Sequence, residues 1–564
     1  MSESYVEAAA GGPWSGAAYL NADQRGVGEV AGKPNFSIDR AALQMTGFNE
    51  TVQPDGTVVL TPAPGWSSKA GLPFTVTYAF RATAPETMPD DAQGFSRFNA
   101  AQIAQAELAM QGWADAANIT FVRVGEGASG EAAYSDQAIM LFGNYSSGVA
   151  GASAFAFFPN NTAISARSGD VWMNVSIGYN ANPSGANRGG MVLAHEIGHA
   201  IGMAHPGDYD AGDDDGRAIT YQADAEYFQD SNQYTVMSYF REANTGADFG
   251  GRFPAAPMLD DIAAIQVEYG ANMATRSGDT VYGFNSTAGR PWFEASVANR
   301  PVFAAWDAGG ADTFDFSGYS QDQLIDLRAG FFSDVGGLVG NVAVAQGAVI
   351  ENAKGGWGAD RINGNAADNA LYGGSGGDTL EGFAGRDYLR GEEGSDSLSG
   401  GGEFDDLHGN RGDDTVAGGA GADWVVGGQD RDLLSGDDGA DIVYGNLGDD
   451  TLSGGADADL VRGGQGHDVL RGDAGDDWLS GDRGDDTVTG GAGADIFHGS
   501  SDAGIDRITD FSLAEGDRVQ LDPGTAFRLM AWGGDTLLDF GDGHQMVLVG
   551  VQAATLAGGW LLYA

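Results

Sequence analysis

Hydrophobic and polar positions follow a strict nine-residue pattern from residue 355 to residue 498, which divides into sixteen nonapeptides. Glycine opens every unit, and the eighth position is apolar in all sixteen. The sixth position is Asn369 in one unit and Asp in the other fifteen. One apolar position per unit predicts a short strand with a single inward side chain, followed by a glycine-rich turn. Two units complete one coil, so the block predicts a parallel β-roll of eight coils.

Outside the repeats, the hydrophobic pattern is that of a globular domain with flanking β structure. It predicts a helix over Ala100–Ala117 and strands over Phe74–Phe80 and Ile119–Val124. Residues 1–270 therefore form a predicted α/β or α+β domain. Residues 271–354 and 499–564 alternate short β-prone runs with Gly-Asp turns, and we expect them to flank and cap the roll.

Composition excludes several classes of partner and chemistry. The chain has 564 residues, a net charge of −51 and no cysteine. Such a charge repels phosphate backbones and anionic lipids, so we expect neither nucleic acid nor a membrane surface as partner. Any metal must be bound by His, carboxylate or backbone oxygen. Residues 1–7 lack the basic and apolar stretches of a secretory signal, so we do not expect export by that route. We expect no transmembrane helix either, because no apolar run is long enough to span a membrane.

The negative charge is concentrated in the repeats, which hold 31 acidic and 8 basic residues, a net charge of −23. Carboxylates at this density can pack together only if divalent cations neutralise them, and hard oxygen ligands favour calcium. The predicted ligands are turn carbonyls and sixth-position carboxylates: Gly356, Gly358, Asp360, Gly374, Gly376, Asp378, Asp387, Asp396, Asp405, Asp414, Asp423, Asp432, Asp441, Asp450, Asp459, Asp468, Asp477, Asp486 and Asp495. The block resembles the calcium-binding repeats of RTX proteins, best seen in residues 373–380 and 490–497, which implies a roll that folds on meeting extracellular calcium.

A second motif points to zinc. His195-Glu-Ile-Gly-His-Ala-Ile-Gly-Met-Ala-His205 fits His-Glu-x-x-His-x-x-Gly-x-x-His at every position. On a helix, His195 and His199 share one face and can present two imidazoles to one ion. Gly202 can take the positive φ that ends the helix and turns His205 back as third ligand. We expect the remaining histidines, His408, His467, His498 and His544, to be solvated surface residues.

Downstream, Tyr234-Thr-Val-Met-Ser-Tyr239 resembles the Met-turn of metzincins. With it, the chain resembles the serralysins, secreted zinc proteases with an RTX C-terminal half, also through residues 112–121, 258–272, 278–284, 306–317 and 350–352. The resemblance implies an apolar floor beneath zinc from Met237 and a phenol near the metal from Tyr239. It also implies calcium sites between catalytic domain and roll, held by Arg276, Gly278, Thr280, Asp307, Gly309, Gly310, Asp312 and Glu351.

The leading hypothesis is a secreted zinc endopeptidase. Zinc would activate a water molecule, Glu196 would serve as general base and then general acid, and Tyr239 would stabilise the oxyanion. An edge strand within Ala152–Pro159 would pair with an extended protein or peptide substrate. The alternative is a calcium-dependent surface or matrix protein with a vestigial protease domain.

The predicted organisation has five segments. They are an N-terminal segment at 1–40 that could contain a propeptide, a metzincin catalytic domain at 41–272, a β-rich connection at 273–354, the roll at 355–498, and a β cap with secretion signal at 499–564. An acidic, cysteine-free chain that folds only in extracellular calcium suits export through a type I secretion apparatus. Diffusion away from the cell and retention at its surface both stay open.

Overall fold

The computed structural model describes residues 19–52, 58–62, 65–67, 69–89, 91–125, 127, 130–149, 152–159, 168–209, 218–500, 504–556 and 558–563. The chain divides into two compact units. One comprises Met1–Gly310 with Ala329–Val349, and the other Ala311–Arg328 with Ile350–Ala564. None of the described helices is both long and apolar enough to cross a membrane.

The first unit is an α/β structure built on a five-stranded sheet. The strand order is β6 (Ile119–Arg123), β5 (Phe74–Phe80), β7 (Met140–Tyr145), β9 (Val171–Asn174) and β8 (Ala154–Ala156). The first four strands are parallel, and β8 runs antiparallel to β9 at the sheet edge. The strand predicted within Ala152–Pro159 is therefore confirmed as an edge strand. The strands predicted over Phe74–Phe80 and Ile119–Val124 are confirmed as β5 and β6.

The helices of this unit are α1 (Ile38–Met45), α2 (Ala100–Ala116), α3 (Gly178–Ala181), α4 (Arg188–Ala200), α5 (Tyr221–Asp224) and α6 (Leu259–Tyr269). Smaller β elements are the hairpins β1 (Glu29–Val30) with β2 (Lys33–Pro34) and β3 (Phe48–Val52) with β4 (Val58–Pro62), the strand β10 (Val281–Gly283), and a sheet of β11 (Phe303–Ala305), β15 (Val342–Val344) and β14 (Phe332–Ser333). The predicted helix over Ala100–Ala117 corresponds to α2. Asn99 caps its N-terminus by accepting a hydrogen bond from the backbone N–H of Gln102 (3.0 Å).

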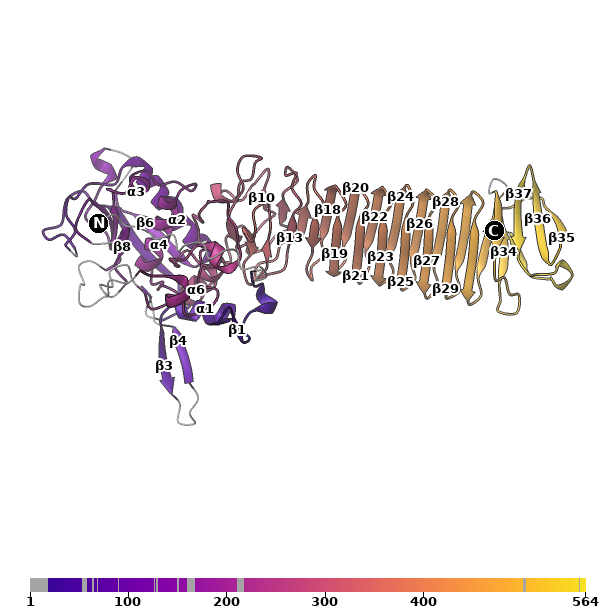
Figure 1. Ribbon diagram of the computed structural model, residues 1–564, viewed down its shortest axis with the longest axis horizontal. Helices are drawn as coiled ribbons and strands as arrows, with labels where there is room; N and C mark the ends of the chain where they lie inside the picture. Colours follow the sequence, from indigo (N-terminus) through magenta and orange to yellow (C-terminus); the bar gives the residue numbers. More distant parts are fainter. Residues whose placement is uncertain are drawn as a thin grey trace. The chain divides into compact units, whose positions relative to one another are not determined.

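The second unit is a roll of two facing parallel sheets (Figure 1). One sheet contains β12 (Thr313–Asp315), β16 (Asn352–Lys354), β18 (Ala370–Ser375), β20 (Tyr388–Glu393), β22 (Asp406–Arg411), β24 (Trp424–Gln429), β26 (Ile442–Leu447), β28 (Leu460–Gln465), β30 (Trp478–Arg483), β32 (Ile496–Gly499), β34 (Arg518–Leu521) and β38 (Leu561–Tyr563). The other contains β13 (Leu324–Asp326), β17 (Arg361–Asn363), β19 (Thr379–Ala384), β21 (Ser397–Gly402), β23 (Thr415–Ala420), β25 (Leu433–Asp438), β27 (Thr451–Ala456), β29 (Val469–Ala474), β31 (Thr487–Ala492), β33 (Ile505–Ile508), β37 (His544–Leu548), β36 (Asp535–Gly541) and β35 (Arg528–Trp532).

The register of the roll confirms two nonapeptides per coil. Leu371 pairs with Leu389 and Leu380 with Leu398, each 18 residues along the chain. All sixteen eighth-position side chains are between 0% and 2% exposed, so they form the interior of the roll. The strands after residue 499 continue both sheets, and β35–β37 end one of them in antiparallel pairs, as expected of a β cap.

Glycine in the turns is required by close approach as well as by backbone conformation. A Cβ on Gly394, whose φ is +142°, would lie 1.3 Å from the carbonyl oxygen of Gly376 in the preceding coil. Opening glycines meet the sixth-position carboxylate of their own unit instead, since a Cβ on Gly373 would lie 2.3 Å from Oδ2 of Asp378. The stacked turns and the aspartate ladder leave no room for a side chain at these positions.

Candidate metal centre

Helix α4 carries the first two histidines and Glu196. Its N-terminus is capped by Asn187, whose side chain accepts from the backbone N–H of Gly189 (2.9 Å). Trp113 of α2 donates from Nε1 to the carbonyl of Ala194 (3.0 Å), which anchors the middle of α4. His195 and His199 therefore lie one helical turn apart on a fixed, buried helix.

The third histidine reaches the same point because α4 ends at the predicted glycine. Gly202 has a φ of +112°, and the backbone N–H of Met203 donates back to the carbonyl of Gly198 (2.9 Å). A Cβ on Gly202 would also approach Cα of Gly65 to 3.2 Å. The predicted turn is confirmed, and it places His205 beside the other two imidazoles.

The three Nε2 atoms converge at 3.1 Å (His195 to His199), 3.0 Å (His199 to His205) and 3.2 Å (His195 to His205). Among the described residues, they make the one group of three or more His, Cys, Asp or Glu side chains suited to a metal ion. Tetrahedral zinc with Zn–N bonds of 2.0–2.1 Å would separate the nitrogens by about 3.3 Å. The spacing in the structure therefore fits zinc closely.

The hydrogen bond of Nδ1 determines the tautomer of each imidazole ring. Nδ1 lies 2.9 Å from the carbonyl oxygen of Val236 in His195, 2.7 Å from that of Met203 in His199, and 2.8 Å from that of Tyr209 in His205. Because a carbonyl only accepts, each Nδ1 must donate, and three Nε2 lone pairs then face one another. Three converging lone pairs repel unless a cation lies between them.

Electrostatics agree with neutral imidazoles. Burial lowers the pKa of His195, His199 and His205 to about 3, and a neighbouring imidazole lowers each further. All three rings are therefore uncharged at neutral pH. Neutral imidazole is the form that binds a metal ion.

Glu196, Met237 and Tyr239 complete the centre. Glu196 is 5% exposed on α4, beside His195. Met237 is fully buried beneath α4, so close that a Cβ on Gly198 would lie 2.4 Å from its Sδ. The Tyr239 ring lies 4.5 Å from that of His205 and 5.6 Å from that of His195, between centroids.

Sequence reasoning missed two buried aspartates behind this centre. Asp230 accepts hydrogen bonds from the hydroxyls of Tyr209 (2.8 Å) and Ser238 (2.6 Å). Tyr209 is also the carbonyl partner of His205, and its ring stacks on that imidazole at 5.2 Å. Burial raises the pKa of Asp230 to about 7.

Asp261 of α6 holds Val236, the carbonyl partner of His195, in a similar way. Its carboxylate accepts from the hydroxyl of Thr235 (2.6 Å) and the backbone N–H of Val236 (2.7 Å), and the carbonyl of Val236 accepts from His195. Burial raises the pKa of Asp261 to about 7. Neither aspartate belongs to a metal-ligand motif, so only the three-dimensional contacts identify them.

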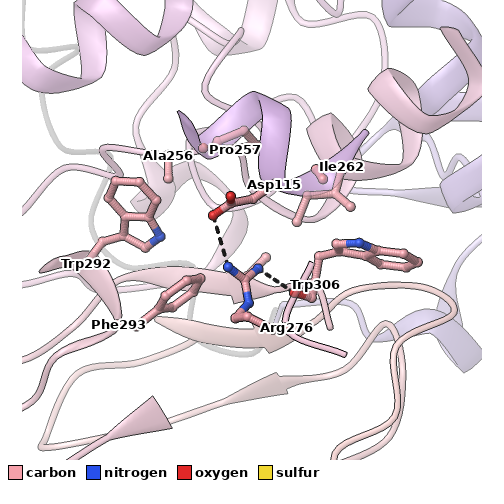
Figure 2. Close-up of a pocket in the computed structure, with 11 residues that line it drawn as sticks. Asp115, Ala256, Pro257, Ile262, Arg276, Trp292, Phe293 and Trp306 are labelled. Atoms are coloured by element: carbon pink, nitrogen blue, oxygen red, sulfur yellow. Dashed lines mark hydrogen bonds and ion pairs between the residues drawn. The ribbon is translucent and has the colours of Figure 1, made fainter. Parts of the chain in front are cut away.

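Of the eight residues expected to bind calcium before the repeats, six lie in the first unit. The Arg276 side chain makes an ion pair with Asp115 (2.9 Å) and donates to the carbonyl of Trp306 (2.5 Å) beside a small pocket (Figure 2). Its guanidinium is thus engaged, and a backbone carbonyl is all that Arg276 can offer a cation.

The other five expected ligands in this unit form close pairs. Thr280 donates to the carbonyl of Gly278 (2.9 Å), Asp307 accepts from the N–H of Gly309 (3.0 Å), and a Cβ on Gly310 would lie 2.6 Å from the carbonyl carbon of Gly278. In the second unit, the N–H of Asp312 donates to Oε2 of Glu351 (2.7 Å).

The sixth-position aspartates of the repeats form two ladders. The backbone N–H of each of these residues, from Asp360 to Asp477, donates to Oδ1 of the residue 18 positions later at 2.7–3.1 Å. In the thirteen aspartates from Asp378 to Asp486, Oδ2 is buried without a hydrogen-bond partner. One oxygen of each carboxylate thus stacks the coils, and the other is available to a cation.

Burial also disfavours the charged form of these carboxylates unless a cation neutralises them. It raises the pKa of Asp378 to about 6 and that of Asp432 to about 8, with nearby aspartates adding to the effect. The turn glycines expected as ligands also stack, with Gly356 beneath Gly374 and Gly358 beneath Gly376. These turn carbonyls therefore repeat once per coil, as the carboxylates of the ladder do.

Two of the histidines expected to be solvated surface residues are partly buried in the roll. His408 contacts the ring of Trp424 edge-on at 5.9 Å, and His498 stacks on that of Trp478 at 5.2 Å. The expectation that His408 and His498 are fully solvated is therefore wrong.

Comparison with known proteins agrees with both halves of this description. The model of the family described as Peptidase M10 serralysin C terminal matches residues 271–399, and that of the RTX calcium-binding nonapeptide repeat matches residues 399–434, 435–470 and 471–506. Metallopeptidase AprA of Pseudomonas marginalis is 45% identical over 356 residues, which are 62% of this chain and 69% of that protein. Serralysin G of Dickeya chrysanthemi is 44% identical over 356 residues, 62% and 68% of the two chains.

The α/β unit with its nonapeptide roll is thus a zinc metalloendopeptidase that carries RTX repeats and binds calcium. More narrowly, the chain belongs to the serralysin family, since more than two thirds of the length of these relatives aligns with it at 44–45% identity. The predicted family, fold class and enzyme class are confirmed.

Proposed function

We propose that the chain is a secreted endopeptidase in which His195, His199 and His205 hold one zinc ion. The convergence of three proton-free Nε2 atoms carries this proposal, because their lone pairs face one another at 3.0–3.2 Å and a cation between them would bind all three. Bound there, zinc would polarise the scissile carbonyl and acidify the attacking water. Three protein ligands leave a coordination position open for substrate.

Glu196 would move the proton. It is buried on α4 next to His195, and from there its carboxylate would take a proton from the attacking water. It would then deliver that proton to the leaving amine. Tyr239, whose ring lies beside those of His205 and His195, would donate a hydrogen bond from its phenol to the developing oxyanion.

The substrate would bind as an extended strand along β8, the edge of the five-stranded sheet. Backbone hydrogen bonds from an edge strand hold a peptide with little dependence on its side chains, which suits broad cleavage of proteins. The contact of β8 with α4 supports this placement, because it brings the edge close to the helix that bears Glu196.

Calcium would be bound in the repeats through the turn carbonyls and the Oδ2 atoms that have no hydrogen-bond partner. Before the repeats, it would be bound by Arg276, Gly278, Thr280, Asp307, Gly309, Gly310, Asp312 and Glu351. A chain that needs calcium to neutralise its carboxylates would stay unfolded in the cytosol and fold outside the cell. We propose export through a type I secretion apparatus on this ground. The domain limits given above, including a propeptide within residues 1–40, belong to the same proposal.

The proposal is tested with Glu196→Ala, assayed for casein hydrolysis in millimolar calcium together with zinc analysis. Loss of the general base should lower kcat/KM by at least ~10²-fold while zinc content stays at the wild-type level. Glu131→Ala, which removes an exposed carboxylate from the same unit, serves as the matched control. Equal activity of Glu196→Ala and wild type would favour the vestigial-protease alternative instead.

A further inference from the structure

The edge strand β8 is followed by an aromatic side chain that the core of the first unit does not use. Phe155 and Phe157 contact each other at 5.8 Å between ring centroids and pack into one cluster with Trp172. Alternation along an extended chain places Phe158 on the other face. Phe157 is 8% exposed, whereas Phe158 is 43% exposed. The packing of the sheet therefore does not explain a phenylalanine at position 158.

The face of the strand that carries Phe158 is apolar. Ala154 and Ala156, four and two residues earlier, share this face by the same alternation. Pro159 follows directly along the chain. From Ala154 to Pro159, β8 and its extension thus present methyl groups and one aromatic ring, without any charged side chain. Such a surface favours an apolar partner, because both sides remove apolar area from water on contact.

The Phe158 ring borders the three-histidine centre. Its centroid lies 5.3 Å from that of the His199 imidazole, and the two ring planes are inclined at 59°. Aromatic rings at this separation are in contact. His199 itself is only 7% exposed, so Phe158 is the more accessible of the two rings. A peptide bound along β8 with its scissile bond at the centre would therefore pass beside the Phe158 ring.

The backbone on both sides of Phe158 is held in place. Phe157 makes two backbone hydrogen bonds with residues 169–170, donating at 3.0 Å and accepting at 2.8 Å. Pro159 has a restricted φ, and its Cγ would lie 4.0 Å from a Cβ on Gly202, the residue that ends α4. A side chain on a backbone fixed in this way loses little freedom when a ligand packs against it, which favours binding.

We propose that Phe158 forms the wall of an apolar subsite that selects the substrate side chain on one side of the scissile bond. The inference rests on the proposed peptidase activity and on substrate binding along β8. A large aliphatic or aromatic side chain would bury apolar area against the Phe158 ring and the methyl group of Ala156. A charged side chain would lose hydration there without gaining a partner, so charged residues would be disfavoured. Phe158 is thus a specificity-determining residue.

A solely structural role for Phe158 makes different predictions. If the ring only shielded His199 from solvent, its removal would weaken metal retention and slow the cleavage of all substrates alike. A subsite wall instead leaves the centre intact and changes the relative rates for different substrates, since discrimination depends on contacts that differ between them. The two roles are therefore separable by experiment.

The experiment compares full-length wild type, Phe158→Ala and Phe158→Leu in millimolar calcium. The matched control is Val122→Ala, because Val122 is 44% exposed on β6, the opposite edge of the same sheet. Each protein digests one peptide library, and the residues on both sides of every cleaved bond are recorded. Zinc retention against a chelator and circular dichroism are measured on the same samples. Binding of a preferred peptide is measured by fluorescence anisotropy in Glu196→Ala protein, with and without Phe158→Ala.

Wild type should prefer large apolar residues at one of the two positions that flank the cleaved bond. Phe158→Ala should lower that preference about tenfold, with zinc retention and circular dichroism unchanged. In Glu196→Ala protein it should also weaken binding of the preferred peptide. Phe158→Leu should keep most of the preference, because leucine is also apolar and large, and Val122→Ala should keep all of it.

The proposal is overturned if Phe158→Ala has the wild-type profile, if both flanking positions change alike, or if Val122→Ala changes the profile too. It is also overturned if Phe158→Ala loses zinc more readily and cleaves all peptides more slowly by one factor. Equal casein hydrolysis by Glu196→Ala and wild type would instead contradict the proposed function, so the two failures are distinguishable.

Discussion

At the scale of single residues, the geometry of the three-histidine centre depends on carboxylates that lie behind the imidazoles. Each histidine donates from Nδ1 to a carbonyl, and two of these carbonyls are held by buried aspartates. Asp230 fixes Tyr209, which orients His205, and Asp261 fixes Val236, which orients His195. Such outer contacts keep the Nε2 lone pairs aimed at one point.

Asp230→Ala should therefore impair a centre that it does not contact. The substitution leaves the hydroxyls of Tyr209 and Ser238 buried without their shared acceptor, which loosens both the His205 carbonyl partner and the turn before Tyr239. We expect a loss of roughly 10–100-fold in kcat/KM together with weaker zinc retention against a chelator. Asp23→Ala, which removes an exposed aspartate from the same unit, is the control. Wild-type zinc retention in Asp230→Ala would contradict the argument.

The sequence predicts the residues of the histidine motif but not the aspartates behind it. The three histidines, Glu196 and the turn at Gly202 follow from spacing, because helical periodicity fixes which side chains share a face. Asp230 and Asp261 do not, since their partners lie 21 and 26 residues away and no local pattern relates them. Tertiary contacts of this kind become visible only in the folded chain.

At the scale of elements, α4 and the Met-turn pack against each other through a glycine. Gly198 leaves the space that the Sδ of Met237 fills, and the ring of Trp113 closes it from the other side. The motif predicts Gly202 as a turn residue but gives no reason for glycine at 198. The structure supplies that reason as close packing.

Gly198→Ala should therefore destabilise the first unit even though alanine favours helices. Its Cβ would lie 2.4 Å from Met237 Sδ and 3.0 Å from Trp113 Cζ2, and both neighbours are buried. Overpacking of this kind costs about 1–3 kcal/mol, measurable as a lower thermal midpoint with reduced casein hydrolysis. Gly185→Ala, whose Cβ would meet only Ala255 at 3.8 Å, should leave both unchanged. Equal stability of the two variants would show that the site adapts.

The roll was the element most open to prediction. A single nine-residue period fixes strand, turn and interior together, and the observed 18-residue register follows from it. The period does not reveal that the two oxygens of each carboxylate differ in role. Oδ1 accepts a hydrogen bond from the preceding coil, whereas Oδ2 is buried without a hydrogen-bond partner.

At the scale of the whole molecule, we expect the net charge of −51 to make folding depend on both calcium and protons. In the unfolded chain an aspartate titrates near ~3.9. In the folded roll without calcium, burial raises the pKa of Asp378 to about 6 and that of Asp432 to about 8. A raised carboxylate pKa means that protonation stabilises the fold: this stability is fully present below pH ~4 and is lost as pH rises through ~6 to ~8.

We therefore expect opposite pH responses with and without calcium. In a chelator, thermal unfolding of the roll followed by circular dichroism should have a higher midpoint at pH 5 than at pH 8, because protons then neutralise the ladders. With calcium, the concentration needed for folding should be higher at pH 5 than at pH 7.5, because the ion must displace those protons. Repeating both series in high salt separates the buried ladders, which salt screens poorly, from the exposed charges. A chelated roll that becomes more stable as pH rises would show that the ladders are not the groups coupling folding to pH.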